Sequence, residues 1–233
     1  MRLHKHPHKD TAAGNIVSFS RYAKKLRQRV IRICPENDGL ELLYSNQRHP
    51  GTFFTVKILC WALQDNGDVV AVIPWLNRVT TAPELKDPDE ALFEGYRTPG
   101  SDYMFNEAPE HKVQELKTAL EFFGQDARTD GKIVQEIPDS IGTHALLVED
   151  GWRTLRLQEI QRWQLDTEGK LTPLTQTETA PGDGIRVDEQ PAFRYYFQQE
   201  VARKVRQKDP ETLVAIASLM QRQTPDDETE QQH

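Results

Sequence analysis

Glu107, His111 and Glu115 recur at every fourth position around Pro109, where a helix is expected to begin. On a helix this spacing places the imidazole between two carboxylates on one face. Such a group can act as a general base or hold a metal ion. The same spacing also occurs around an ordinary salt-bridged histidine on a helix surface, and this is the interpretation that we favour.

His144 is a second candidate, because it follows Ser140 and Gly142 at the start of an expected strand. The sequence has no Gly-x-Ser-x-Gly elbow to hold a nucleophile, and no Gly-x-x-x-x-Gly-Lys or Gly-x-Gly-x-x-Gly phosphate-binding turn. A hydrolase- or transferase-type enzyme that uses Glu107, His111 or His144 is therefore the alternative hypothesis. The catalytic residues stay unknown, and no cofactor is predicted.

Three histidines near the N-terminus, His4, His6 and His8, are spaced two apart and would lie on one side of an extended chain. Imidazoles in this arrangement can capture Ni, Cu or Zn. Flexible tails do this adventitiously, and no carboxylate or thiol is fixed nearby. We therefore predict no physiological metal site.

Basic residues are concentrated at the start of an otherwise acidic chain. Residues 1–34 hold nine Lys or Arg and one acid, a net charge of +8, and residues 35–233 hold the other 20 basic and 35 acidic residues, a net charge of −15. The segment 21–32 could contact nucleic-acid phosphates through Arg21, Lys24, Lys25, Arg27 and Arg29. Because the acidic remainder would repel phosphate, we favour a solvated or acid-paired helix face. Weak nucleic-acid binding is the third hypothesis.

The long segment 77–108 is rich in proline and aromatic residues, and it is the first place to expect a ligand or a partner. Long ordered loops with convergent polar groups often line binding sites. The simpler interpretation is that the rings only cover the sheet. The candidate ligand-binding residues are Phe93, Tyr96, Arg97, Asp102, Tyr103, Phe105 and His111.

The composition, with 37% apolar and 28% charged residues, indicates a soluble acidic protein. No apolar signal-peptide core precedes the first expected helix. Every uninterrupted apolar stretch, Val69 to Ile73 among them, is far shorter than the roughly 20 residues of a membrane helix. We expect a cytoplasmic protein without a membrane partner. Cys60 is predicted to be a buried thiol, and its pairing with Cys34 stays open.

Five acidic or amide clusters close on a glycine between apolar runs, which predicts hairpin turns of an antiparallel sheet. The strongest hairpin joins a strand over 53–63 to a strand over 69–76 across Asp65-Asn66-Gly67. Both strands are nearly continuous in apolar character, which predicts burial on both faces. Further strands are predicted at 30–34, 40–44, 143–148, 152–157, 160–165 and 171–174.

Helical periodicity predicts four helices. They cover about 20–29, 109–123, 193–207 and 210–220. The fold class that follows is α+β, with one antiparallel sheet of about six to eight strands, a basic N-terminal helix, a helix near 109–123 and a C-terminal helical pair. We expect a single domain over 16–222, with a possible division near 125–138, between disordered tails at 1–15 and 223–233.

One internal similarity is visible. Residues 61–72 align without gaps on residues 163–174, an offset of 102, with coincident Trp, Leu and Gly. A duplicated β-rich unit would produce this pattern, but so would any two hairpins with the same loop length. The shared loop length is the explanation that we favour.

The preferred hypothesis is a non-catalytic binding or regulatory protein that uses a sheet face or the loop at 93–106. Its partner is an unknown protein or small molecule, and a homodimer is possible. It follows from the lack of a nucleophile, cofactor or metal motif in the sequence.

Overall fold

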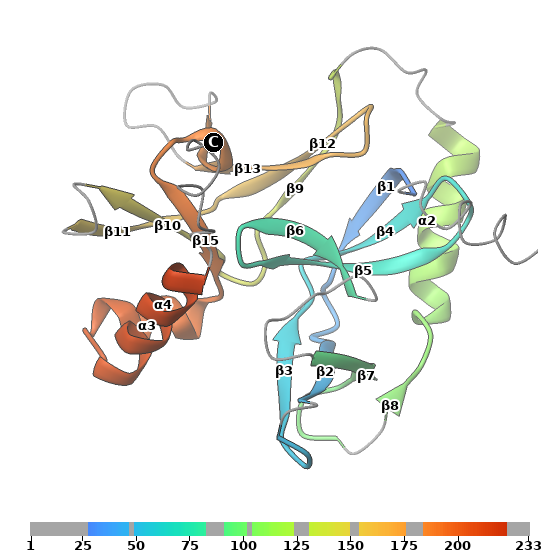
Figure 1. The fold of residues 1–233 in the computed structure, drawn as a ribbon. Coiled ribbons are helices and arrows are strands. Elements are labelled where there is room, and N and C mark those ends of the chain that lie inside the picture. The colour runs from blue at the N-terminus through green and yellow to red at the C-terminus, as the bar shows by residue number, and fades with distance from the viewer. Residues whose placement is uncertain are drawn as a thin grey trace, which may run out of the picture.

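The computed structural model describes residues 28–46, 49–82, 91–101, 104–123, 131–149, 154–175 and 184–222. This part of the chain is mostly β, with 48% strand and 22% helix, and its four small antiparallel sheets form a propeller-like ring (Figure 1). The predicted fold class, one larger α+β sheet with an N-terminal helix, was wrong. Within the described residues, Gln28 and Arg29 are not helical, and the rest of that predicted helix lies outside them.

The first half, residues 28–123, contains sheet A with the strand order β1-β4-β5-β6 and sheet B with the order β3-β2-β7-β8. Helix α2 follows them. The bounds are β1 Val30–Pro35, β2 Glu41–Asn46, β3 Phe53–Lys57, β4 Cys60–Gln64, β5 Val69–Trp75, β6 Arg78–Thr81, β7 Ala91–Arg97, β8 Met104–Phe105 and α2 Glu110–Phe123.

The second half, residues 131–222, contains sheet C with the order β11-β10-β15 and sheet D with the order β14-β13-β12-β9. A helical pair closes it. The bounds are β9 Ile133–Pro138, β10 His144–Glu149, β11 Thr154–Glu159, β12 Arg162–Asp166, β13 Leu171–Thr175, β14 Ile185–Arg186, a 3-10 turn Val187–Glu189, β15 Phe193–Phe197, α3 Gln199–Arg206 and α4 Pro210–Arg222.

The two halves repeat one topology. Read from the first strand of each half, sheets A and D join the first, fourth, fifth and sixth strands in the same order, and sheets B and C join the third, second and seventh. Both second-to-seventh strand pairs also carry an irregularity at the same place, between Leu43 and Tyr44 in one half and between Leu146 and Leu147 in the other. Two unrelated hairpins would not share all of this, so the similarity at 61–72 and 163–174 belongs to a duplicated unit.

Side-chain contacts repeat as well. Trp61 packs on Tyr96 with ring centroids 4.9 Å apart, and Trp163 packs on Tyr196 at 5.7 Å. Each indole N–H donates to a carboxylate that directly follows the first strand of its half. Trp61 donates to Glu36 at 2.5 Å, and Trp163 donates to Asp139 at 2.9 Å.

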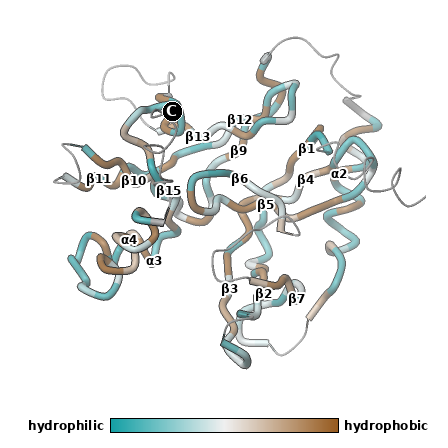
Figure 2. The backbone as a smooth tube through the Cα atoms, viewed as in Figure 1, coloured by the Kyte–Doolittle hydropathy of each residue, from teal (hydrophilic) through white to brown (hydrophobic). Residues whose placement is uncertain are grey.

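Glycine fixes the matching hairpins of sheets A and D. Gly67 has a φ of +90° and Gly169 a φ of +83°, which residues with a Cβ rarely adopt. The hairpin β4–β5 confirms the predicted turn across residue 66, and β4 is buried along its whole length, as expected for a strand covered on both faces. Figure 2 shows hydrophobic residues along the strands of this central region.

The predicted strand at 53–63 is in fact two strands in different sheets. The chain leaves sheet B after Lys57, passes through the fully buried Ile58 and Leu59, and enters sheet A at Cys60. The amide of Leu59 still donates to Val72 at 3.0 Å, so the crossing costs no backbone hydrogen bond there. The helix predicted from 193 begins only at Gln199, because 193–197 form β15.

One hydrophobic core joins the two halves. It contains residues of both, among them Ile33 and Leu59 from the first half and Ile137 and Trp163 from the second. The side chain of Gln135 in β9 also accepts from the amide of Ile33 in β1 at 2.9 Å and donates back to its carbonyl.

The first half also closes a strand edge of the second half at the junction. The carbonyl of Leu76 accepts from the amide of Tyr196 at 2.6 Å and so covers the edge of β15. The equivalent edge of β7 is covered by its own half, where Tyr96 pairs with Phe105 of β8. In return, the side chain of Gln198 bonds both the amide and the carbonyl of Lys57 in β3.

Candidate functional site

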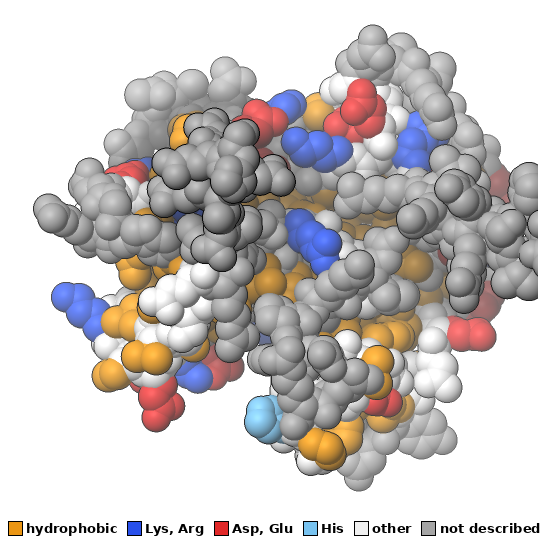
Figure 3. Space-filling model, viewed as in Figure 1, with side chains coloured by type: hydrophobic (Ala, Val, Ile, Leu, Met, Phe, Trp, Pro, Cys, Tyr) orange, Lys and Arg blue, Asp and Glu red, His pale blue; other side chains and the backbone are white. Residues whose placement is uncertain are grey.

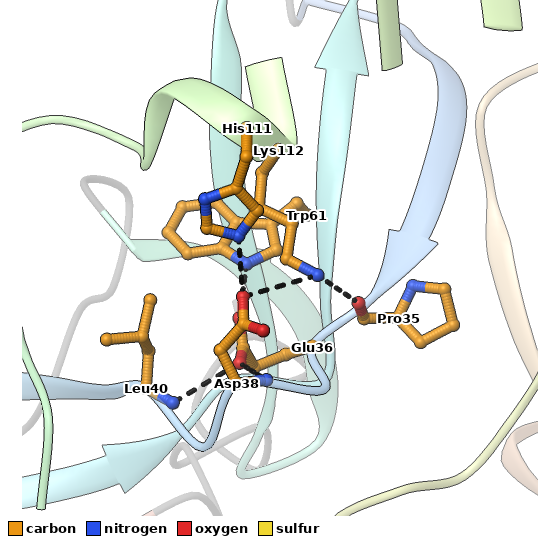
Figure 4. Close-up of polar contacts among 7 residues, drawn as sticks. All are labelled: Pro35, Glu36, Asp38, Leu40, Trp61, His111 and Lys112. Atoms are coloured by element: carbon orange, nitrogen blue, oxygen red, sulfur yellow. Dashed lines mark hydrogen bonds and ion pairs between the residues drawn. The ribbon is translucent and has the colours of Figure 1, made fainter. Parts of the chain in front are cut away.

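A network of carboxylates anchors helix α2 to the turn after β1 (Figure 4). Glu36 is 6% exposed and accepts from the indole of Trp61 and from the amides of Asp38 and Leu40. All three donors converge on one side chain. This carboxylate therefore fixes both the turn and the tryptophan beneath it.

His111 and Lys112 at the start of α2 both reach Asp38. His111 Nε2 lies 2.7 Å from Asp38 Oδ2, and Lys112 Nζ lies 3.5 Å from the same oxygen and donates to the carbonyl of Pro35 at 3.3 Å. The hydrogen bond from His111 and the charge of Lys112 lower the pKa of Asp38. His111 therefore pairs with a residue of the β1–β2 turn, and Glu107 precedes α2 instead of sharing its face.

Asp38 and His111 also border an open hollow of about 780 Å³. Its wall includes Phe105 and Glu107, so three sequence-predicted candidates (Phe105, Glu107 and His111) do come together. Asp38 is the member that the sequence prediction missed, because it lies 73 residues away from His111. Whether these residues bind a ligand stays a prediction.

The other predicted ligand-binding residues are placed differently. Phe93 and Tyr96 pack against one another at 5.1 Å, and Tyr96 is only 4% exposed, so these rings cover the core. Arg97 and Glu41 share the opposite face of the sheet, where Nη2 of Arg97 lies 3.9 Å from Oε2 of Glu41. Asp102 and Tyr103 lie outside the described residues.

His144 does not join His111. It is 3% exposed in sheet C, where Nδ1 lies 2.9 Å from the carbonyl of Gly142 and Nε2 lies 2.7 Å from Arg206 of α3. No hydrogen bond from Ser140 to this histidine is found. These contacts place His144 in the packing of α3 on its sheet.

Both cysteines are free, buried thiols, as predicted for Cys60. Burial, with a further contribution from Glu115, raises the pKa of Cys34 to about 12. Burial raises the pKa of Cys60 further. Neither thiol has the low pKa that a nucleophile needs near neutral pH.

Of the predicted nucleic-acid residues, only Arg29 falls within the described ranges. Its Nη1 donates to the carbonyl of Thr167, and it lines a cleft of about 510 Å³ between the halves, together with Arg78 and Lys170. Arg29 therefore joins the halves. Arg21, Lys24, Lys25 and Arg27 lie outside the described residues.

The least expected surface is the outer face of sheet B. Opposed residues of an antiparallel pair share a face, so the strand register defines three rows across β3, β2 and β7. The rows are Phe53–Ser45–Leu92, then Thr55–Leu43–Gly95, then Lys57–Glu41–Arg97. Met104 of β8 pairs with Arg97 and extends the third row. We call these residues the open face.

The open face exposes large apolar side chains. Phe53 is 58% exposed, Leu92 48% and Met104 43%. Figure 3 shows hydrophobic side chains at the lower end of the molecule, over β2, β3 and β7. Isolated exposed apolar residues are common, but three on one sheet face mark a surface that can dock a partner.

The corresponding face of sheet C is buried. There Leu146 and Val148 of β10 take the places of Leu43 and Ser45, and they pack under α3 and α4 in one hydrophobic cluster with Ala202. Within the described ranges, no helix covers the open face in the same way. Among the described residues, this face therefore lies under two helices in one half and under no helix in the other, where Leu43 at its centre is nevertheless buried.

Within the described ranges, no three His, Cys, Asp or Glu side chains lie in position to hold a metal ion. None of the described helices has the length and apolar character needed to cross a bilayer. Comparisons with protein-family models, curated proteins and solved structures gave no match to this chain.

Proposed function

We propose that the chain is a non-catalytic binding protein that docks a protein partner on the open face. The observation that carries this proposal is the difference between the two halves. A face that α3 and α4 cover in sheet C carries no helix in sheet B within the described ranges, and there Phe53 and Leu92 are exposed at both ends of one row.

The neighbouring contacts suit such a role. Gln198 closes the edge of β3 at Lys57, and β8 closes the edge of β7. A partner is therefore expected to lie on the face of the sheet, not to extend it as an added strand. The buried Glu36 and the ion-paired Asp38 tie α2 to the turn between β1 of sheet A and β2 of sheet B.

A photoreactive phenylalanine analogue at position 53 tests the proposal in cells that make the protein. The same analogue at Val214, which is 67% exposed on α4, is the matched control. We expect a discrete cross-linked product from position 53 and none from position 214.

The product is then identified, purified and titrated against the wild-type chain and the Leu92→Asp variant by calorimetry. We expect Leu92→Asp to weaken binding about tenfold or more and Val214→Asp to leave it unchanged. If position 53 gives no more product than position 214, or if Leu92→Asp binds as tightly as the wild type, the proposed function is wrong.

A further inference from the structure

We infer that the cleft between the two halves binds a small organic anion, with an acidic group on an apolar body. The cleft of about 510 Å³ lies between sheet A and the hairpin of β12 and β13 (Figure 1). None of its lining residues belongs to the open face. Its volume falls within the range of small-molecule sites, which is roughly 300–1,000 Å³.

The floor of the cleft is the face of sheet A that is turned toward the second half. Opposed residues of an antiparallel pair share a face, and Gln64 opposes Val30 while Thr81 opposes Val72. Val30 and Val72 belong to the core that joins the halves, so Gln64 and Thr81 lie on the same side. An apolar floor with two polar side chains suits a ligand that has an apolar body and a few polar atoms.

Gln64 is a buried polar residue whose side chain has no partner. It is 5% exposed, and within the described ranges no hydrogen bond of its side-chain amide is found. Buried side-chain amides are usually hydrogen-bonded to protein, water or a ligand. The residue 102 positions later, Asp166, instead accepts from the backbone amides of Glu168 and Lys170 in its own turn. The two halves differ here, and the difference leaves the side-chain amide of Gln64 available to a ligand.

Two guanidinium groups line the cleft without a carboxylate partner. They belong to Arg29 and Arg78, and no ion pair of either side chain is found among the described residues. The carboxylate of Asp65 accepts from the backbone amide of Arg29 at 3.2 Å. Nε of Arg29 is buried and has no hydrogen-bond partner in the described part of the chain. Guanidinium groups in this state bind phosphate and carboxylate oxygens through charge-assisted hydrogen bonds.

The other charges of the cleft do not cancel these two. Lys170 lines it as well, but its Nζ is shared with Asp188 at 4.0 Å and Glu189 at 3.5 Å. Glu168 is the one acid among the described lining residues. Even if Lys170 is discounted, the two guanidinium groups exceed this acid, although the chain as a whole has a net charge of −7. The local reversal of sign favours an anion over a cation or a neutral molecule.

Calorimetric titration of the full chain with phenyl phosphate at low ionic strength tests the inference. This probe joins an anionic group to an apolar ring. We expect saturable binding with a Kd of about 1 mM or tighter, as for a well-placed ligand of this size. Benzyl alcohol keeps the ring without the charge, and inorganic phosphate keeps the charge without the ring. Each is expected to bind at least about tenfold more weakly.

Two variants and one control locate the bound anion. Arg78→Ala removes an exposed charge, and Gln64→Leu replaces the side-chain amide by an apolar group of similar size. Each is expected to raise the Kd of phenyl phosphate about fivefold or more. Lys117→Ala removes an exposed base from α2, which packs on the other face of sheet A through Leu116, and should leave the Kd unchanged.

Thermal melting and circular dichroism show whether each variant is folded. Arg78 is exposed and makes no ion pair in the described part of the chain, so its variant tests the site even if Gln64→Leu unfolds. If phenyl phosphate shows no saturable binding up to about 10 mM, the inference is overturned. It is also overturned if benzyl alcohol or inorganic phosphate binds as tightly, or if Arg78→Ala binds as tightly as Lys117→Ala.

These outcomes are independent of the proposed function. Cross-linking at position 53 reports on the open face, and the titration reports on the cleft. If the anion does not bind, the docking of a protein partner on the open face is left standing. If the cross-link fails while phenyl phosphate binds, only the proposed function is wrong.

Discussion

Replacing Glu36 by alanine tests the part of the structure that both halves repeat. This side chain is 6% exposed and accepts from three donors, namely the indole of Trp61 and the amides of Asp38 and Leu40. Glu36→Ala leaves all three donors without their acceptor. The indole is fully buried and Leu40 is 7% exposed, so water reaches neither well.

The expected cost follows from the donors that water cannot reach. A buried donor without a partner costs about 1–3 kcal/mol, and two such donors give about 2–6 kcal/mol. The amide of Asp38 lies at a half-exposed residue and adds little. Removal of the buried carboxylate returns part of its desolvation cost, so we expect a net loss of about 3 kcal/mol for Glu36→Ala. Glu36→Gln keeps one acceptor oxygen and is expected to lose about half of that.

Urea unfolding followed by tryptophan fluorescence measures this loss. With an m-value of about 3 kcal/mol/M for a chain of this size, Glu36→Ala lowers the midpoint by about 1 M at constant m. Glu121→Ala, at an exposed position on α2, is the matched control and should change stability by no more than about 0.5 kcal/mol. If Glu36→Ala behaves like this control, the carboxylate does not hold the turn and the reasoning is refuted.

Three further predictions concern the hairpins, the anchor and the thiols. In thermal unfolding, Gly169→Ala should lower the free energy of unfolding by more than about 3 kcal/mol, because its Cβ would meet the backbone of Val30 at 2.8 Å. Gly67→Ala meets no neighbouring atom and should cost only about 1–2 kcal/mol of left-handed backbone strain. Equal costs for the two variants would contradict the packing of the two halves. The lowered pKa of Asp38 means that its stabilising contribution is present above the ordinary pKa of 3.8 and is lost as the pH falls through the folded value. The stability difference between the wild type and Asp38→Asn should therefore shrink from pH 6 to pH 2, and a constant difference in urea titrations would argue against the ion pair. Neither cysteine should react with a thiol-specific disulfide reagent at pH 8 until the chain unfolds, and a fast reaction in the native state would show that the thiols are not buried.

Local patterns predicted some of the hairpins but not the sheets, and the hairpin predicted at Glu36–Gly39 was wrong because β1 and β2 do not pair. Asn66-Gly67 and Glu168-Gly169 each mark a hairpin turn that the structure contains. Such turns need a residue with positive φ, and glycine adopts this conformation readily. No such signal marks Ile58 and Leu59, where the chain changes sheet. Nor does the sequence show that β1 and β2, neighbours along the chain, lie in different sheets.

The segment at 193–207 shows a related ambiguity. Phe193, Tyr196 and Phe197 have helical spacing, but they are also aromatic residues that favour strands. Pairing with β10 decided the outcome, and that contact lies about 50 residues away in the sequence. The helix then begins at Gln199, where the pairing ends.

The candidate surfaces depended on contacts that the sequence does not display. Phe105, Glu107 and His111 were found because they are close in sequence, whereas Asp38 was not. A binding sheet face was predicted only in general terms, and its residues were missed because the exposure of Phe53 depends on which sheet the helices cover. The one available signal was the similarity of 61–72 to 163–174, which, taken as a duplication, would have prompted a comparison of the two halves.

The way in which β15 is completed has a consequence for biosynthesis. Leu76, which covers the edge of β15, and Lys57, which Gln198 caps in return, are made before the second half. The early portion carries β8 at its own sheet edge, so sheet B can form while the rest is still being translated, whereas the core that both portions share closes only afterwards. The later portion relies on Leu76 to cover β15. When made alone, it would expose the unpaired edge of that strand to any neighbouring chain.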